Sequence, residues 1–156
     1  MSSPLYLEDI TVGQTFVTGT VEVETEKVKA FAAEFDPQPF HLDEVAAQAS
    51  MFGGLVASGW HTTCLTMRLL VDGEFKIAGG LIGLGVEEVR WPRPVRPGDV
   101  LRVASEVLDV RPSKSQPDRG IVKMRNTTRN QAGEPVMVQV VNILVPRRPS
   151  LPEEVP

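Results

Sequence analysis

The chain has 156 residues, of which 42% are hydrophobic and 23% are charged, and this length is sufficient to bury a hydrophobic core without disulfides or structural metals. Its formal net charge of −4 at pH 7 gives no general attraction to nucleic acid or to an anionic membrane, so neither is expected as a partner. The single cysteine excludes an internal disulfide framework, and we expect a cytoplasmic protein, because no signal peptide and no membrane span of about 18 apolar residues is recognisable.

The first strand is expected within residues 15–24, where apolar and polar residues alternate. Val17, Val21 and Val23 are predicted to share its buried face, because every second side chain of a strand lies on the same face. Thr25 follows as the expected N-cap of a helix. The apolar residues of that helix recur at helical spacing and are Val28, Phe31, Ala32 and Phe35.

The next segment, FDPQPFHLDE (residues 35–44), fits neither a regular helix nor a strand, since it contains two prolines. Pro37 disfavours helical backbone at Asp36, so the preceding helix is expected to end there. A second short helix is expected through DEVAAQA, residues 43–49.

The same irregular segment carries the first candidates for catalysis, Asp36 and His41. An aspartate and a histidine that share one water molecule can remove a proton and return it, which is general acid–base chemistry. Five extended residues span about 17 Å, so the chain must fold back for the two side chains to meet. The alternative is that Asp36 and His41 only cap a turn and a helix. Residue types alone leave both interpretations open.

Residues 58–72, SGWHTTCLTMRLLVD, predict a helix that is buried on all sides. Its apolar residues spread around the whole circumference, and Arg68 is the only charged residue before Asp72. On this helix we expect His61 to be a hydrogen-bonded core histidine rather than a second base. Cys64 lies mid-helix among apolar residues, which predicts a poor nucleophile.

Four strands are expected in the second half, at about residues 81–91, 100–110, 120–128 and 135–145. The turn sequences between them are too short for helical crossovers, so the sheet should be mainly antiparallel. In the first of these strands the apolar phase shifts by one residue across Glu87 and Glu88, which predicts a bulge. The last strand is apolar on both faces and therefore predicts a covered inner strand.

These elements predict an α+β protein in which a curved, mainly antiparallel sheet wraps around one long buried central helix. We expect one domain over residues 1–146. Residues 147–156 have no periodicity and are expected to form a flexible tail.

The run DPQPFHLD resembles the signature of the MaoC-like dehydratases and R-specific enoyl-CoA hydratases, approximately Asp-x-Asn-Pro-x-His-x-Asp. VASGWHT, residues 56–62, resembles the start of that family's central helix. The resemblance covers roughly residues 6–145 and implies the hotdog fold. Asp36 and His41 match the family's catalytic pair, which activates water. Gly59 matches the glycine whose backbone N–H binds the thioester oxygen, and it also opens the predicted helix, where unpaired N–H groups point outward.

The chain departs from the family pattern at several positions. Gln38 stands where an asparagine is usual, and Ser58 replaces a histidine that is common in close hydratase relatives. Met67 falls where some members carry a serine, with Thr66 adjacent. These changes leave the Asp–His pair intact and bear on the identity of the substrate.

The activity that the resemblance implies is reversible hydration of a trans-2-enoyl thioester to an (R)-3-hydroxyacyl thioester. Coenzyme A or acyl-carrier protein would carry the acyl group, and no metal or other cofactor is expected. Two other classes remain open, a non-catalytic acyl-thioester-binding protein and a hotdog thioesterase. Thioesterases of this fold place an acid on the central helix, where this chain has only Asp72 at the far end.

The remaining expectations concern metals, phosphates and assembly. Two histidines twenty residues apart and one cysteine make a poor metal site. Three arginines, Arg90, Arg93 and Arg96, either contact coenzyme A phosphates or belong to a solvated proline-rich loop. A sheet around one helix leaves an edge exposed, so we expect a homodimer or a higher homo-oligomer with the acyl groove between subunits.

Overall fold

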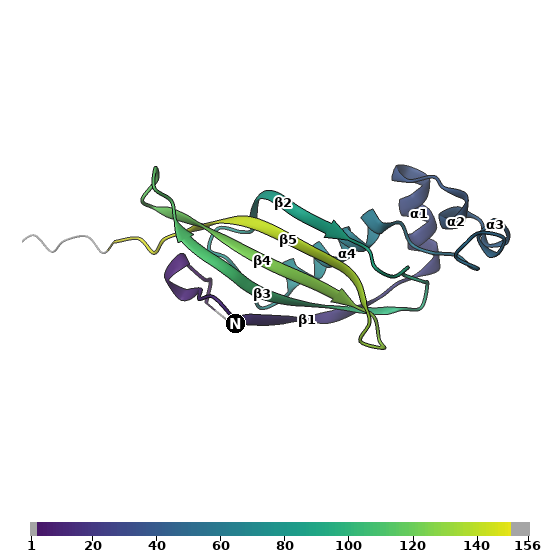
Figure 1. Ribbon diagram of the computed structural model, residues 1–156, viewed down its shortest axis with the longest axis horizontal. Coiled ribbons are helices and arrows are strands. Elements are labelled where there is room, and N and C mark those ends of the chain that lie inside the picture. Colours follow the sequence, from purple (N-terminus) through teal and green to yellow (C-terminus); the bar gives the residue numbers. More distant parts are fainter. Residues whose placement is uncertain (1–2, 151–156) are drawn as a thin grey trace, which may run out of the picture.

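The computed structural model describes residues 3–150. The four predicted strands of the second half are confirmed to within one or two residues at each end. In chain order the elements are η1 (Leu7–Asp9), β1 (Thr15–Glu22), α1 (Thr25–Phe35), α2 (Pro39–Leu42), α3 (Glu44–Gln48), α4 (Gly59–Asp72), β2 (Ile82–Arg90), β3 (Val100–Pro112), β4 (Arg119–Arg129) and β5 (Pro135–Pro146) (Figure 1).

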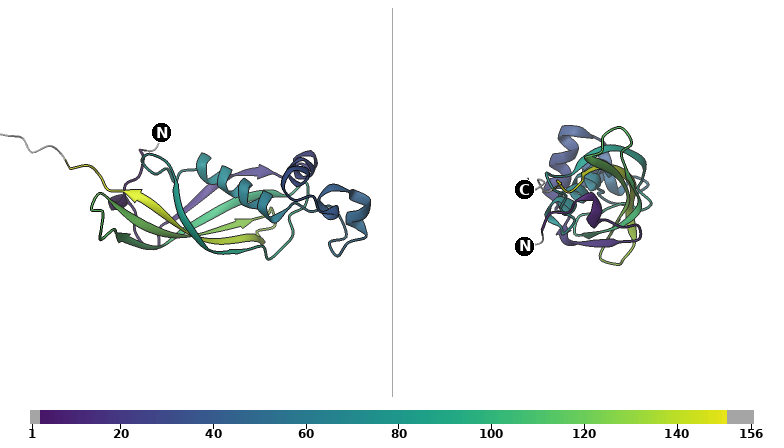
Figure 2. Two further views of the ribbon diagram at one scale, coloured as in Figure 1. Left: turned by 90° about the horizontal axis from the view of Figure 1, so that it is seen from above. Right: turned by 90° about the vertical axis from the view of Figure 1, so that its left-hand side faces the viewer.

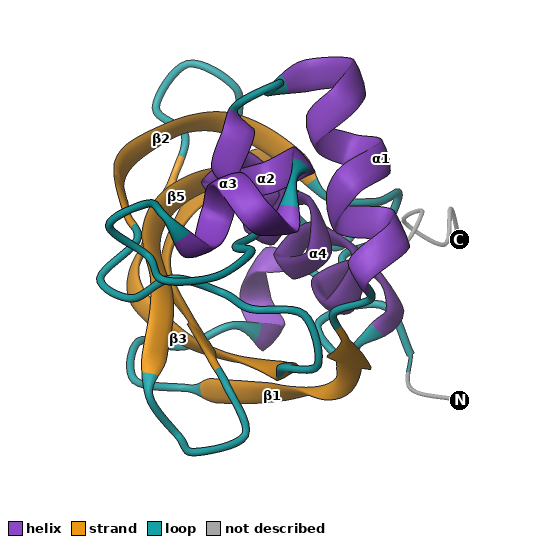
Figure 3. Ribbon diagram, turned by 90° about the vertical axis from the view of Figure 1, so that its right-hand side faces the viewer, coloured by secondary structure: helices purple, strands orange, loops and turns teal. Residues whose placement is uncertain are grey.

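The strands form a five-stranded sheet in the order β1-β3-β4-β5-β2, and every neighbouring pair is antiparallel. The sheet curves around α4, and α1, α2 and α3 gather at one end of the molecule (Figures 2 and 3). This arrangement confirms the predicted α+β architecture. β5 lies between β4 and β2, as its two apolar faces predict. The predicted bulge in β2 is confirmed as a register shift between Val86 and Glu88.

β1 contains a second bulge, which the sequence pattern did not predict. Val17 pairs with Ala104 and Thr20 pairs with Arg102, so three steps along β1 match two along β3. The extra residue places the side chains that follow it on the opposite face of the sheet. Val17 is consequently 52% exposed, whereas Val23 is buried. The prediction that Val17, Val21 and Val23 share one buried face is therefore wrong at Val17.

The central helix α4 has one buried face and one exposed face. The prediction that it is buried on all sides is therefore wrong for the single chain. Its inner face is covered by the sheet and by α1. Its outer face exposes Trp60 (57%) and Met67 (52%). The α4–β2 surface, as we call this apolar region, consists of Trp60, Cys64, Met67 and Val71 of α4 and Ile82, Leu84 and Val86 of β2, all exposed.

Two buried clusters hold the sheet and the helices together. The one that packs beneath α1, α3 and α4 includes Val28, Leu55, Leu101 and Val136. Leu101 and Val28 are fully buried, and each such side chain contributes about 1.5–3 kcal/mol to stability by leaving water. Replacing Leu101 by alanine should therefore cost about 2–5 kcal/mol. The second cluster, around Leu7, lies toward the other end of α4.

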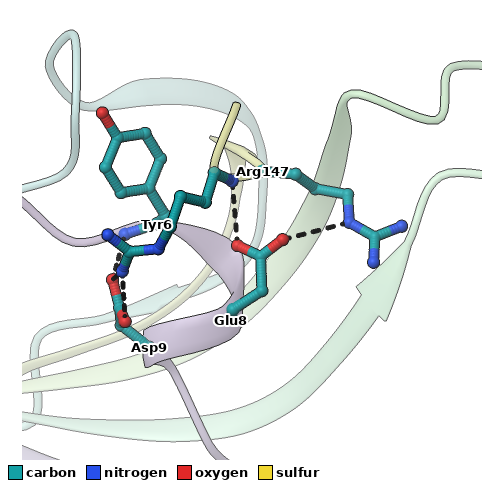
Figure 4. Close-up of polar contacts among 5 residues, drawn as sticks. Tyr6, Glu8, Asp9 and Arg147 are labelled. Carbon is teal, nitrogen blue, oxygen red and sulfur yellow. Dashed lines mark hydrogen bonds and ion pairs between the residues drawn. The ribbon is translucent and has the colours of Figure 1, made fainter. Parts of the chain in front are cut away.

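The two described ends of the chain contact each other. Glu8 of η1 accepts hydrogen bonds from the backbone N–H of Arg148 at 2.9 Å and from Nε of Arg147 at 3.3 Å, and Asp9 binds the Arg148 guanidinium at 2.7 Å (Figure 4). The Arg148 N–H lowers the pKa of the Glu8 carboxyl, and Arg147 adds to this effect. The first residues of the predicted flexible tail are thus held, and residues 151–156 lie outside the described part. None of the helices in residues 3–150 is both long and apolar enough to span a membrane.

Candidate active site

A tight helical turn brings Asp36 and His41 together. α1 ends at Phe35, before the Asp-Pro pair, as predicted. Pro39 then takes the first position of α2, where its missing N–H costs no hydrogen bond. The expectation of wholly irregular backbone is wrong here, because residues 39–42 form this one turn. The turn folds the chain back and supplies the bend that the pair requires.

The N-terminal ends of the flanking helices also differ from expectation in one case. Thr25 is the first residue of α1 rather than its N-cap, and Glu24 caps the helix without a side-chain hydrogen bond. The predicted helix after residue 42 is confirmed as α3. Asp43 caps α3, because its carboxylate accepts from the backbone N–H groups of Val45 and Ala46.

His41 is oriented by the backbone. Its Nδ1 lies 2.6 Å from the carbonyl oxygen of Val56. A carbonyl only accepts, so Nδ1 carries the hydrogen, and in the neutral ring Nε2 is an acceptor. Nε2 faces Asp36 Oδ2 at 3.3 Å, with the histidine side chain 8% and the aspartate side chain 23% exposed. A neutral imidazole and a carboxylate are then two acceptors that together can bind the two hydrogens of one water molecule.

Ser58 is a third member of this constellation, with a role that the sequence did not predict. Its hydroxyl donates to Asp36 Oδ2 at 2.7 Å, and its oxygen accepts from the Trp60 N–H at 3.3 Å as the N-cap of α4. Ser58 is fully buried. The sequence signal was a serine at the first position of the predicted helix, a residue type that favours the N-cap. The geometry makes Ser58 the group that orients the Asp36 carboxylate.

Gly59 begins α4 and lies directly against the indole of Trp91. A Cβ atom at this position would stand 2.7–3.0 Å from three ring atoms of Trp91, closer than carbon atoms approach. Trp91 also packs edge to face with Trp60, with ring centroids 5.1 Å apart. Glycine is therefore required by packing, besides being at the end of α4 where backbone N–H groups are free of intrahelical partners.

Asp36, His41 and Gly59 line one cavity of about 510 Å³. We call it the dyad cavity. Aromatic and proline side chains supply much of the rest of its wall, including Phe40, Trp60, Trp91 and Pro92. The structure thus brings together all three predicted site residues, at the N-terminal end of a helix where the dipole favours negative charge.

Of the three arginines singled out in the sequence, Arg93 lines the dyad cavity. It pairs with Glu134 at 2.9 Å. Arg96 donates to the Phe52 carbonyl at 2.6 Å, and Arg90 forms an ion pair with Glu88. Each guanidinium is therefore engaged within the chain.

His61 lies in the core as predicted, whereas Cys64 does not lie where it was expected. His61 is a core residue that stacks on Phe31, with ring centroids 4.8 Å apart. Among residues 3–150, however, its buried Nδ1 has no hydrogen-bond partner, so the expectation of a hydrogen-bonded histidine is wrong for that atom. Burial lowers the pKa of His61, and the charge of Lys27 lowers it further. Cys64 is exposed rather than enclosed by apolar groups.

Within the described part of the chain, no three His, Cys, Asp or Glu side chains gather as a metal site. The chemistry that the cavity supports is proton transfer. An oriented imidazole and an oriented carboxylate face the same space, and helix N–H groups border it.

A curved antiparallel sheet wrapped around one central helix makes this chain a hotdog-fold protein. Residues 9–130 match the MaoC like domain, and the chain belongs to that family. A MaoC-like dehydratase from Rhodospirillum rubrum is 54% identical, with 94% of this chain and 99% of that chain covered and a TM-score of 0.90. R-hydratase PhaJ1 from Pseudomonas aeruginosa is 29% identical over 98% of this chain and 95% of that chain, with a TM-score of 0.74. A 3-hydroxybutyryl-CoA dehydratase from Methylorubrum extorquens is 32% identical over 111 residues, covering 70% of this chain and 68% of the relative.

Proposed function

We propose that this protein catalyses the reversible addition of water to a trans-2-enoyl thioester, giving the (R)-3-hydroxyacyl thioester. The observation that carries the proposal is the Asp36–His41 pair, held by Ser58 and Val56 at the N-terminal end of α4. The names of the relatives, a dehydratase, an R-hydratase and a 3-hydroxybutyryl-CoA dehydratase, support the same reaction class. Coenzyme A is the carrier that the last of these names favours.

Asp36 and His41 would bind one water molecule between them. In hydration, an O–H bond of this water breaks as its oxygen attacks C3 of the enoyl group, and one member of the dyad takes the proton. The dyad then passes this proton to C2, since neither the carboxylate nor the acceptor nitrogen Nε2 carries a proton beforehand. The dyad therefore gains one proton and gives up one, and the product contains both parts of the water. Because only protons move, the reaction requires neither a metal nor a redox cofactor.

Gly59 would stabilise the charge that develops during attack. The thioester oxygen becomes enolate-like, and the free N–H at the first turn of α4 can donate to it. One such preorganised donor is worth about 3 kcal/mol of barrier lowering. The positive end of the α4 dipole adds to this effect.

The α4–β2 surface supports a homodimer as the working form. β2 is an edge strand that exposes Ile82, Leu84 and Val86, and the outer face of α4 lies beside it. An apolar strand edge of this kind favours association with a second copy. Light scattering at micromolar concentration should give at least twice the chain mass, and Met67→Glu should shift the protein toward monomer. A monomeric wild-type protein would contradict this proposal.

One assay distinguishes hydration from the two other candidate classes. Crotonyl-CoA is incubated with the protein while the absorbance of its conjugated double bond and the release of free thiol are followed together. Loss of the chromophore without thiol supports the hydratase. Thiol release identifies a thioesterase, and binding with neither change identifies a non-catalytic binding protein.

A further inference from the structure

A second cavity of about 420 Å³ lies between α4, β2 and the inner face of the sheet. We call it the amide cavity, because the side-chain amides of Asn126 and Gln139 lie on its wall. Most of its wall is apolar, and the α4–β2 surface contributes Met67, Leu84 and Val86 to it. A cavity with such walls suits a hydrocarbon chain.

Three polar side chains interrupt this apolar wall in a row. Ser105 of β3 pairs in register with Asn126 of β4, and Asn126 pairs with Gln139 of β5. Residues paired across antiparallel strands place their side chains on the same face, and all three line the amide cavity. They are 2%, 3% and 6% exposed, respectively.

The row is only partly satisfied by the protein. The Ser105 hydroxyl donates to Asn126 Oδ1 at 2.7 Å, which assigns the oxygen and leaves Asn126 Nδ2 as a donor. No side-chain hydrogen bond within the described residues involves Asn126 Nδ2 or the Gln139 amide. The fully enclosed side-chain atoms that lack a partner there are His61 Nδ1 and Asn142 Oδ1, so the two amides keep contact with the open space of the cavity. Water can bind them in that space, and a ligand oxygen of suitable chemistry can take its place.

The amide cavity and the dyad cavity lie next to each other along α4 and β5, without a shared wall residue. Thr62 and Val136 line the first, and Thr63 and Gln139 line the second. Met67 stands two helical turns after Gly59, about 12 Å along α4. An acyl chain that starts at a thioester bound by Gly59 and runs along α4 would therefore bring its far end to the row.

No ionisable side chain lines the amide cavity among the described residues. A carboxylate or an ammonium group on the acyl chain would be buried there without a counter-charge, which is strongly unfavourable. The group that the row suits is therefore polar and uncharged, such as a hydroxyl or a carbonyl, with an oxygen that accepts from an amide NH₂.

We propose that the substrate is an enoyl thioester whose acyl chain carries an uncharged oxygen-bearing group, bound by Asn126 and Gln139. This inference rests on the proposed function, since it names the substrate class of the same site. Asn126 and Gln139 would determine specificity and would take no part in proton transfer.

The test compares matched substrates. Hexenoyl, octenoyl and decenoyl coenzyme A thioesters with trans-2 double bonds are each prepared with and without a hydroxyl on the terminal carbon. For the chain length that spans the two cavities, kcat/KM should be at least about tenfold higher for the hydroxylated member, because its oxygen completes buried hydrogen bonds. Equal rates for both members at every length would overturn the inference.

Two variants tie the preference to the row. Gln139→Leu removes an amide that has no partner in residues 3–150, and Asn126→Leu with Ser105→Ala removes the remaining polar atoms together. Both should lose the preference, measured as the ratio of kcat/KM between the hydroxylated and the unsubstituted member of a pair. Met124→Leu changes an apolar wall residue at nearly constant volume and should keep it. A preference that persists in both row variants would contradict the proposal.

Binding of the saturated analogues separates this inference from the proposed function. Octanoyl and terminally hydroxylated octanoyl coenzyme A are titrated calorimetrically into wild type and Gln139→Leu. If no thioester is hydrated but the hydroxylated analogue binds more tightly to wild type alone, the hydratase proposal fails and the role of the row stands. If enoyl thioesters are hydrated and neither rate nor affinity distinguishes the analogues, the hydratase stands and the role of the row fails.

Discussion

The dyad cavity and the amide cavity lie along the same helix, yet they differ in whether the protein itself supplies hydrogen-bond partners for their polar groups. In the dyad cavity, Asp36 accepts from Ser58 and His41 donates to Val56. In the amide cavity, Asn126 Nδ2 and the Gln139 amide take part in no side-chain hydrogen bond within the described residues and keep contact with the cavity. The first set is oriented before any ligand arrives, as proton transfer requires. The second is open to the cavity, where a ligand can replace water, as recognition requires. Substitutions should therefore change turnover in one cavity and substrate choice in the other.

The largest effect is expected from the dyad itself. Asp36→Asn keeps shape and hydrogen-bonding capacity but removes the group that accepts a proton. Turnover should fall by about 10²–10⁴, and His41→Ala should cost a similar factor. The double variant should lose far less than the product of the two factors, because both groups act on one water. Steady-state kinetics on crotonyl-CoA, with binding of a saturated analogue expected to persist, measures this.

A neighbouring aspartate provides the control. Asp43→Asn changes a carboxylate that only caps α3, and asparagine caps about as well as aspartate, so turnover should be unchanged. If Asp36 merely capped a turn, Asp36→Asn would lower the melting temperature and leave the rate of the folded protein intact. Folded Asp36→Asn and His41→Ala proteins with wild-type rates would end the proposed mechanism.

Residue 59 can be glycine because of packing against Trp91 or because of thioester binding, and a substitution distinguishes the two reasons. Gly59→Val should reduce kcat/KM by up to about 10², since loss of an oxyanion donor costs about 10²–10³ and the N–H here is obstructed rather than removed. The new side chain must also displace Trp91. Gly59→Ala combined with Trp91→Ala makes room for the Cβ and separates the two reasons. Activity restored to that of Trp91→Ala would assign glycine to packing, and activity that stays low would assign it to thioester binding.

The third prediction concerns Ser58, which orients Asp36 and also caps α4. Ser58→Ala should lower turnover about tenfold, because a hydrogen bond to a charged group is worth about 1.5–3 kcal/mol and part of it is replaced by water. The lost cap should also cost about 1 kcal/mol of stability. Ser58→Gly lacks the same hydroxyl, but glycine is tolerated as an N-cap. Equal loss of turnover in the two variants, with unequal melting temperatures, is the expected result. If turnover in the two variants instead falls in step with the melting temperature, Ser58 acts only as the N-cap of α4.

Local patterns predicted the strands and the ends of the helices, because alternation and turn residues act over a few positions. The bulge of β2 left a visible phase shift at Glu87 and Glu88. The bulge of β1 left none, since Val17, Val21 and Val23 continue the alternation through it. On α4, apolar residues around the whole circumference predicted burial. Such a pattern does not distinguish residues buried within one chain from residues buried against a second chain. The residues of the α4–β2 surface were therefore predicted to be buried, although they are exposed in the single chain.

The site was predictable to different degrees for the same reason. Asp36, His41 and Gly59 were found because two short motifs resemble a known family, and each motif is local. The bond from Ser58 to Asp36 joins residues 22 apart. The row of Ser105, Asn126 and Gln139 depends on the register of three strands. Neither has a signature in sequence spacing, so only the folded structure places these groups together.

The smallest effect is expected from His61, a third kind of buried polar group. Its Nδ1 is fully enclosed without a partner within residues 3–150, unlike the amides, and His61 lines neither cavity. No ligand can compensate for it, so its cost should appear in folding rather than in substrate choice. Burial lowers its pKa below the ordinary 6.5. Below about pH 6.5 the unfolded chain therefore binds a proton that the native protein excludes.

Stability should consequently be at its full value above about pH 6.5 and should fall as the pH decreases toward the native pKa of His61. His61→Phe keeps an aromatic ring against Phe31 and removes the titration. Between pH 7.5 and 5.5 its melting temperature should decline less than that of wild type, by about 2–4 °C for each 1 kcal/mol involved. Turnover near neutral pH should be equal in the two proteins, because His61 faces neither cavity. Parallel melting curves at both pH values would show that another group is responsible. A changed substrate preference in His61→Phe would contradict the distinction by which Asn126 and Gln139 bind a ligand and His61 affects only folding.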